Sequence, residues 1–288
     1  MMRKATISAA KILLYLVLVG VTVAGMVEFV LPQMGYPSGS KLPFIVLGAV
    51  NFVAMFVPAV LLTLIMDRKS PMAMGLQGRG SVADFLTGGV VGGFIFLCAL
   101  TAAVFGGWAS IDMSFAGFSM MAMALGAIGT TLAAAGEEVM LRGYVLQELM
   151  GKFSTAASVI ASSLFFTALH ANALIGNEMA AIGALNIFLA SILLSLAYLA
   201  TRTLWLPIGI HAGWNFVQGP LLGINVSGND LGTGWDPVTL SGPPMMTGGT
   251  FGFEGSLLGI IGPATGIAMV VLMRRRQSGR AGVPPALR

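Results

Sequence analysis

Long apolar runs alternate with short polar or turn-forming segments along this chain. A membrane-spanning helix needs about 20 predominantly apolar residues. Eight segments approach this pattern, centred on residues 12–32, 43–66, 83–106, 118–150, 154–170, 181–201, 204–222 and 255–273. Helices are expected within them because unpaired backbone groups cannot face lipid. The pattern predicts an all-α fold, a polytopic transmembrane helix bundle with about eight spans.

Composition agrees with a lipid environment. Apolar residues make up 56% of the 288 residues and charged residues only 9%, whereas a soluble domain carries about 25% charged residues. The first apolar run is long for the core of a secretory signal and lacks a small-residue cleavage pattern, so we expect it to remain as the first span. The single cysteine, Cys98, excludes an internal disulfide framework.

The basic residues predict an orientation in the membrane. When the eight segments alternate sides, one side receives most of the Lys and Arg residues: Arg3, Lys4, Arg68, Lys69, Arg79, Lys152, Arg202 and Arg274–Arg276. The other side receives only Lys41. Because cytoplasmic loops are enriched in Lys and Arg, both termini are predicted to be cytoplasmic.

The same pattern predicts one domain and its surroundings. Residues 1–276 are expected to form a single transmembrane domain, and residues 277–288 a disordered cytoplasmic tail. The net charge of +4 comes from basic residues beside apolar segments, which indicates a lipid bilayer as partner and no nucleic acid. The Gly- and Pro-rich loop 223–254 is either a lid over the bundle or a disordered connector. Nothing in the sequence indicates the oligomeric state.

Several ionisable side chains fall inside the apolar segments, where each costs about 2.5–3.5 kcal/mol on insertion scales. Glu138 and Arg142 are four residues apart on one helical face, which predicts an internal ion pair. Glu137 is rotated from Glu138 by about 100°, so it can point elsewhere. An unpaired carboxylate in such surroundings suits a general base.

The only two histidines complete this polar set. His170 ends the segment around 154–170. In the segment around 204–222, His211 and Asn215 are four residues apart and share a helical face. A single His or Asn in a membrane helix often makes only an interhelical hydrogen bond. Together with Glu137, however, these groups can activate a water, either around Zn²⁺ or by general-base action, and the amide can stabilise an oxyanion. Hydrolysis within the membrane is the chemistry that they fit.

In this order and spacing, Glu137-Glu138-x-x-x-Arg142, Phe166-x-x-x-His170 and His211-x-x-x-Asn215 resemble the motifs of the CAAX protease and bacteriocin-processing family, also called the Abi family. Its members are intramembrane endopeptidases, and the resemblance covers about residues 118–222. It implies that Glu137 activates the attacking water with His170, and that His211 and Asn215 bind the water or a metal and stabilise the oxyanion. Glu138 and Arg142 would support the site.

If a metal is used, the resemblance implies Glu137, His170 and His211 as its ligands. Zn²⁺ and a metal-free mechanism both stay open, and the zinc motif HExxH is absent. The resemblance further implies a multi-pass protein of the bacterial inner or plasma membrane. The implied substrates are prenylated CAAX termini for some members, and peptides or membrane-anchored proteins for a bacterial one.

Residue counting places the site groups at different depths along their helices, with His211 only about 13 Å from Arg202. A common site therefore requires tilted helices around a water-filled cavity, which we predict to open to the cytoplasm. Closely packed helices are expected at two groups of glycines: Gly88, Gly89, Gly92 and Gly93, and Gly209 and Gly213.

Two functions of other classes remain open. The bundle could be a non-catalytic immunity or scaffold protein that keeps the site residues. It could also be a small proton-coupled transporter that uses Glu137 and the two histidines as a relay. A transporter should show paired inverted halves, and no such symmetry is visible in the sequence.

Overall fold

The computed structural model describes residues 2–37, 39–78, 80–231 and 233–280. Arg79 and the last part of the predicted tail, 281–288, lie outside the described residues. The α-helices are α1 Met2–Gly25, α2 Phe44–Ile65, α3 Ser81–Phe105, α4 Met120–Glu138, α5 Leu146–Met150, α6 Thr155–Leu169, α7 Ala171–Leu174, α8 Ala180–Thr201, α9 Trp205–Phe216, α10 Pro244–Thr247 and α11 Ile261–Arg280.

Three wider π-helical segments and several short 3₁₀ turns join or extend these helices. The π segments are η1 Met26–Val30, η4 Val139–Val145 and η5 Val217–Leu221. The 3₁₀ turns are η2 Leu31–Met34, η3 Pro71–Met74, η6 Gly249–Phe251, η7 Phe253–Gly255 and η8 Leu258–Ile260. Through η4, helices α4 and α5 form one continuous rod from Met120 to Met150.

All eight predicted segments are helical, and the all-α membrane bundle is confirmed. Among the described residues, five helices are long and apolar enough to cross a membrane: Thr6–Met34, Phe44–Ile65, Ser81–Phe105, Met120–Met150 and Ala180–Thr201. The apolar helices Thr155–Leu169 and Leu258–Leu272 are shorter. The number of spans therefore remains a prediction.

Glycines bring α3 and α9 into close contact. The sequence predicted close packing at each of these two helices, and the structure shows that they pack against each other. A Cβ on Gly88 would collide with the Leu206 carbonyl oxygen, and one on Gly92 with the Ile210 carbonyl oxygen. The contact is mutual, because a Cβ on Gly209 would collide with the backbone of α3. Small residues permit this approach because no side chain separates the two backbones. The packing fixes the position of α9, which carries His211.

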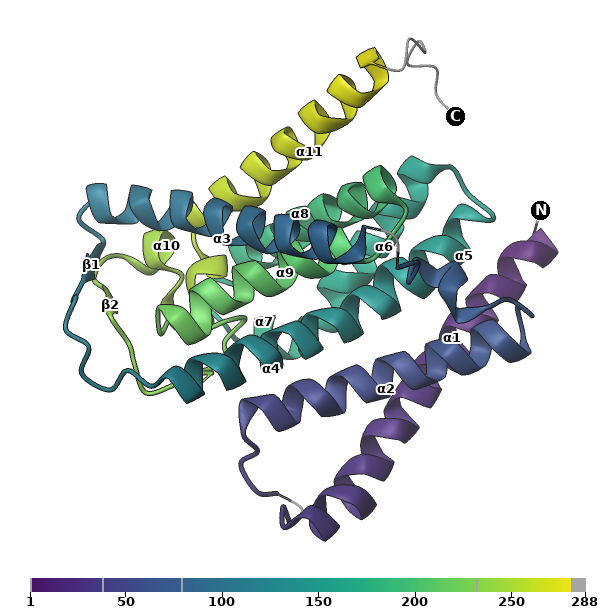
Figure 1. Ribbon diagram of the computed structural model, residues 1–288, viewed down its shortest axis with the longest axis horizontal. Helices are drawn as coiled ribbons and strands as arrows, with labels where there is room; N and C mark the ends of the chain where they lie inside the picture. Colours follow the sequence, from purple (N-terminus) through teal and green to yellow (C-terminus); the bar gives the residue numbers. More distant parts are fainter. Residues whose placement is uncertain (1, 38, 79, 232, 281–288) are drawn as a thin grey trace.

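Helices α2 and α4 meet in the same way. A Cβ on Gly48 would collide with the Gly129 carbonyl oxygen, and one on Gly136 would lie 2.9 Å from the Cα of Phe52. The contact therefore reaches the residue just before Glu137. In Figure 1, α2, α4, α9 and α3 run roughly along the long axis of the molecule, with α8 behind α9.

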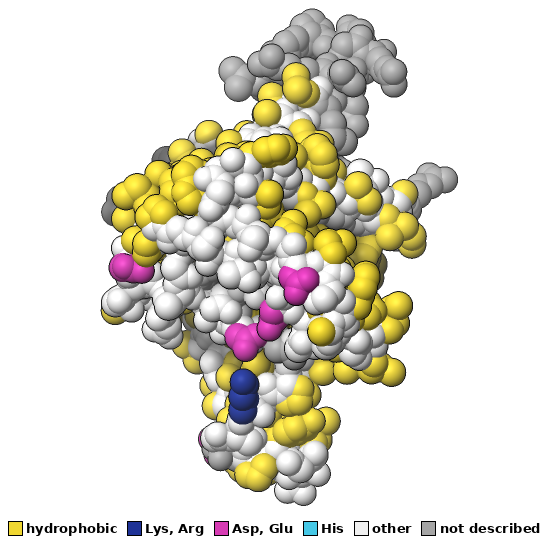
Figure 2. All heavy atoms as spheres, turned by 90° about the vertical axis from the view of Figure 1, so that its left-hand side faces the viewer, with side chains coloured by type: hydrophobic (Ala, Val, Ile, Leu, Met, Phe, Trp, Pro, Cys, Tyr) yellow, Lys and Arg dark blue, Asp and Glu magenta, His cyan; other side chains and the backbone are white. Residues whose placement is uncertain are grey.

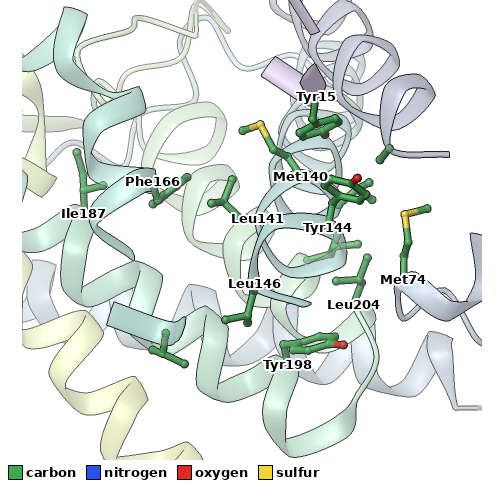
Figure 3. Packing of buried hydrophobic residues seen from close by; sticks show 14 of the residues in the cluster. Tyr15, Met74, Met140, Leu141, Tyr144, Leu146, Phe166, Ile187, Tyr198 and Leu204 are labelled. Carbon is green, nitrogen blue, oxygen red and sulfur yellow. The ribbon is translucent and has the colours of Figure 1, made fainter. Parts of the chain in front are cut away.

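A buried apolar cluster holds the continuous rod of α4, η4 and α5 in the bundle. Figure 3 shows Met140, Leu141 and Tyr144 of η4 beside Tyr15 of α1 and Leu204 before α9. The rings of Tyr15 and Tyr144 are 5.1 Å apart, and the Tyr15 hydroxyl donates a hydrogen bond to the Met55 carbonyl oxygen at 2.7 Å. Aromatic side chains of this size contribute much of a core's stability. The cluster thus joins α1 and α2 to the rod that carries Glu137.

The loop 223–254 is ordered and covers one end of the bundle. Its strand β2 (Val238–Leu240) pairs antiparallel with β1 (Ala109–Ile111), a small addition to the predicted all-α fold. Phe251 and Phe253 are fully buried, and the Phe253 ring packs 5.7 Å from that of Phe96 in α3. Of the two predicted alternatives, the disordered connector is wrong, because this loop buries its own aromatic side chains against the bundle.

The two ends of the bundle differ in charge. Lys11 of α1 pairs with Asp67 and, at 3.3 Å, with Glu148, so the chain start and the loops after α2 and α5 lie at one end. The start of α1 and the end of α11 point towards the same side of Figure 1. Figure 2 looks onto the opposite end, where acidic side chains gather with little Lys or Arg beside them. This separation matches the predicted alternation of the segments.

The predicted tail begins within α11. The described part of this helix runs to Arg280 and so includes residues 277–280, for which the sequence predicted disorder. Arg and Gln are good helix formers, and the sequence has no proline before Pro284 to stop the helix.

Candidate active site

A fully buried ion pair lies behind the site. Arg142 Nη1 donates to Glu138 Oε1 at 2.9 Å, and neither side chain is exposed. Arg142 Nη2 donates to the carbonyl oxygen of Ser191 in α8 at 2.8 Å and to its hydroxyl at 2.7 Å. The predicted pair is therefore present, and it also ties the α4 rod to α8. Arg142 is the group that neutralises the buried Glu138 carboxylate.

His211 of α9 lies between the two neighbouring glutamates. Its Nδ1 is 3.0 Å from Glu138 Oε1, and its Nε2 is 3.8 Å from Glu137 Oε2. An ionised carboxylate can only accept a hydrogen bond, so Nδ1 carries the hydrogen. The contact with Glu138 thereby orients the ring, and Nε2 is directed towards Glu137.

Glu137 differs from Glu138 in being accessible. Its side chain is 22% exposed and lines a cavity of about 1030 Å³. Its Oε2 is buried and has no hydrogen-bond partner. The exposed part of this carboxylate borders the cavity, where it can accept a proton from a bound water. The rotation of Glu137 away from Arg142, which the spacing predicted, is present.

His170 lies on the same cavity wall, next to Phe166. Its Nδ1 is 2.9 Å from the Phe166 carbonyl oxygen, which can only accept, so Nδ1 is the donor and Nε2 carries the lone pair in the neutral ring. The Phe166 ring stands edge-on to His170 at 4.6 Å and to His211 at 6.3 Å between centroids. The Arg142 guanidinium lies over the Phe166 ring, 5.3 Å from the ring centroid. Phe166 thus spaces the two imidazoles.

Asn215 completes the set, one helical turn beyond His211. It lines the same cavity, and its amide makes no hydrogen bond with any described residue. The four residues predicted to act on substrate, Glu137, His170, His211 and Asn215, therefore border one cavity. Glu137 and His211 are brought into direct proximity, while His170 and Asn215 face the shared space.

The expected difference in depth is resolved by the start of α9. Leu204 is fully buried and donates its N–H to the Gly75 carbonyl oxygen at 2.9 Å, and the Trp205 indole donates to the Gln77 carbonyl oxygen at 2.8 Å. Helix α9 consequently begins inside the bundle, beneath residues 71–77. The few residues from there to His211 are enough to reach the level of Glu137.

The cavity is lined by loops at the acidic end of the bundle. Its lining includes Lys41, Asn177, Asn229 and Thr250 from these loops, and none of the described residues in the loops at the basic end. The charge pattern predicts the basic end to be cytoplasmic. The predicted orientation and the predicted opening to the cytoplasm therefore cannot both hold, and each stays a prediction. The loops between helices, which the helical spacing does not describe, decide where the cavity opens.

The part of the chain that carries the site is similar to a known protein family. Residues 119–217 match the family model of the type II CAAX prenyl endopeptidase Rce1-like proteins. This chain carries an Rce1-like domain. The match spans the three motifs and confirms the resemblance to the CAAX protease family, whose members are CAAX-type intramembrane proteases. No curated protein and no solved structure matches the chain.

The Rce1-like domain does not present a ready-made set of metal ligands. Among the described residues, no group of three or more His, Cys, Asp or Glu side chains lies close enough together to hold a metal ion. The suggested ligands Glu137, His170 and His211 are thus not gathered as a triad, and Asn215 is a weak ligand for zinc. The donor set does not fit a zinc centre in this arrangement.

Four further polar residues around the site were missed in the sequence. Ser191 binds Arg142, and Asn51, Asn186 and Glu254 line the cavity. Burial raises the pKa of the Glu254 carboxyl, while hydrogen bonds from Ser227 and the nearness of His170 and His211 oppose the rise. For Asn51, Asn186 and Ser191, a polar residue within an apolar segment was the available signal. Glu254 gave no such signal, because it lies in a loop.

Proposed function

We propose that this protein is an intramembrane endopeptidase in which Glu137 activates a water for attack on a peptide bond. One observation carries the proposal. Glu137 Oε2 has no hydrogen-bond partner and lies 3.8 Å from His211 Nε2, at the wall of a cavity of about 1030 Å³. The Rce1-like domain supplies the same three motifs to this wall.

The first step uses Glu137 and His170. A water held between the Glu137 carboxylate and the unprotonated Nε2 of His170 gives one proton to Glu137 while its oxygen bonds to the carbonyl carbon. The carbonyl π electrons move onto oxygen and form the tetrahedral oxyanion. General-base assistance of this kind contributes about 10²–10⁴-fold to the rate.

The second step breaks the carbon–nitrogen bond. The Asn215 amide N–H and the Nε2–H of protonated His211 stabilise the oxyanion, as fixed donors do in other acyl-transfer sites. Collapse of the oxyanion expels the amine nitrogen, which takes the proton held by Glu137. The products are a carboxylic acid and an amine, and transfer of the acid proton to the amine gives a carboxylate and an ammonium group. Glu138 and Arg142 keep His211 oriented throughout and do not exchange protons with the substrate.

Substrates are peptides or membrane-anchored proteins that enter at the end covered by loop 223–254. The lining combines apolar side chains with asparagines, as expected for a site that binds an extended peptide and places its backbone by a few hydrogen bonds.

The experiment compares cleavage of a fluorogenic peptide library by the purified wild type, Glu137→Gln and Glu148→Gln in detergent. Glu148 is a matched control, because it is a carboxylate of the same rod that binds Lys11 far from the cavity. We expect Glu137→Gln to lose about 10²–10⁴-fold in kcat, and Glu148→Gln to retain activity. Parallel reactions with a zinc chelator separate a metal-dependent site from a metal-free one.

Other outcomes decide against the proposal. Cleavage that survives in Glu137→Gln would show that Glu137 is not the base. Proton uptake into vesicles that requires Glu137, without cleavage, would favour a transporter. A cellular phenotype that tolerates Glu137→Gln would favour a non-catalytic scaffold.

A further inference from the structure

Glu254 brings a carboxylate into the cavity from outside the Rce1-like domain. Ser227 donates to its Oε2 twice, from the backbone N–H at 2.6 Å and from the hydroxyl at 2.8 Å. Its Oε1 accepts no hydrogen bond from a described residue and is not among the atoms shut off from solvent. One oxygen therefore anchors the side chain and the other is left for a ligand.

No described Lys or Arg pairs with Glu254. A carboxylate in partly buried surroundings is costly without a cation, so its retention in a cavity wall calls for a partner that arrives with a ligand. His170 and His211 lie near enough to Glu254 to influence its ionisation. Glu254 is thus within electrostatic range of the reacting groups.

Asn186 of α8 provides a second, independent sign of a ligand. It is only 3% exposed and lines the same cavity. Its Nδ2 donates to the carbonyl oxygens of Glu254 at 2.5 Å and Ser256 at 2.9 Å. Because both amide hydrogens are used, Oδ1 is the remaining acceptor, and it has no partner. A buried acceptor without a donor is unfavourable, so Asn186 Oδ1 is open to an N–H group of a ligand.

The other charges of the cavity do not compensate Glu254. The ionisable residues in its lining are three carboxylates, one lysine and two histidines: Glu137, Asp230, Glu254, Lys41, His170 and His211. The lining therefore favours a positively charged nitrogen over a negative group.

We propose that Glu254 and Asn186 form a subsite for a cationic nitrogen of the peptide substrate, which binds next to the bond that is cut. The Glu254 Oε1 accepts from the cation and Asn186 Oδ1 accepts a further N–H. The cation is either a Lys or Arg side chain or a free α-amino group. This subsite rests on the proposed peptidase function and specifies its substrate class.

Binding is measured separately from cleavage, with fluorescent hexapeptides and the detergent-purified Glu137→Gln protein. The peptides have an alanine–leucine host sequence and are compared in pairs. In one series the members of a pair carry Lys or norleucine at one position, which is varied along the peptide. In the other series they differ in having a free or an acetylated N-terminus. We expect about tenfold or tighter binding of the cationic member of at least one pair. The position of the preference shows whether the side chain or the α-amino group is recognised.

The same pairs are then tested with Glu254→Gln added. Glutamine can still accept both hydrogen bonds from Ser227 but carries no charge. The ratio of the dissociation constants of the neutral and the cationic peptide of a pair should therefore fall to near one. One matched variant should keep the preference for the cation. Glu178→Gln removes a charge at the same end from a residue outside the cavity lining.

Equal affinity for all pairs, including no measurable binding of any, would overturn the subsite. So would an equal loss of preference in Glu178→Gln, because the general negative charge of that end would then explain it. Failure of the proposed function is a separate result, namely no cleavage by the wild type in spite of a cation preference in binding.

Discussion

Glu137 and Glu138 are neighbours in the sequence but belong to two different regions of the protein. Behind His211, Glu138 is fully buried and held by Arg142 and the imidazole. In front of His211, Glu137 is partly exposed to the cavity and one of its oxygens has no partner. The rear region pairs its charges within the protein, although Glu138 Oε2 and Arg142 Nε have no hydrogen-bond partner among the described residues. The front region instead borders the cavity, where water and substrate can reach Glu137.

This difference separates stability from activity. A buried carboxylate that has lost its cation is strongly unfavourable, so the rear region should carry much of the stability of the bundle. Side chains that border a cavity have solvent as an alternative partner, so the front region should tolerate substitution and lose chemistry instead. Substitutions on the two sides of His211 can test this division.

The largest loss of stability is expected for Arg142→Met, which leaves Glu138 charged and buried without its cation. Breaking such a pair costs about 3–5 kcal/mol. Thermal unfolding in detergent, followed by tryptophan fluorescence, measures the change. Glu137→Gln is the comparison from the front region and should unfold close to the wild type.

A double variant sharpens the same comparison. Glu138→Gln together with Arg142→Met removes both charges, so it should be more stable than Arg142→Met alone. An Arg142→Met protein that unfolds no earlier than Glu137→Gln would mean that the rear ion pair does not support the fold.

An intermediate effect is expected for Gly92→Ala at the contact of α3 with α9. The new methyl group collides with the Ile210 carbonyl oxygen, and the resulting displacement should cost about 1–3 kcal/mol and lower peptide cleavage by moving His211. The neighbouring Gly89→Ala is the control, since its Cβ would meet only the Gly209 carbonyl oxygen at 4.0 Å. Equal stability and activity of the two variants would contradict the role given to this contact.

The smallest effect is expected for Ser191→Ala. Arg142 loses the serine hydroxyl but keeps the Ser191 carbonyl oxygen as an acceptor, so the cost should be about 1 kcal/mol. Unfolding by heat or denaturant should show this decrease with cleavage nearly retained. A loss of activity without a loss of stability would place Ser191 in the catalytic region instead.

Local patterns in the sequence determined the helical segments, the grouping of site residues on three of them and the Glu138–Arg142 pair. Each depends on spacing along a single helix, because residues four apart share a face wherever that helix lies. The glycines likewise indicated that α3 and α9 would each pack closely against a neighbour, although not that they would pack against each other.

Contacts between distant segments were decided only by the tertiary structure. The position of His211 between two glutamates depends on where α9 begins beneath residues 71–77, and the opening of the cavity depends on the path of its loops. Glu254 reaches the site because loop 223–254 folds over the bundle and anchors it to Ser227. Spacing along one helix cannot encode such contacts, since they depend on how the backbones and loops of several helices pack together.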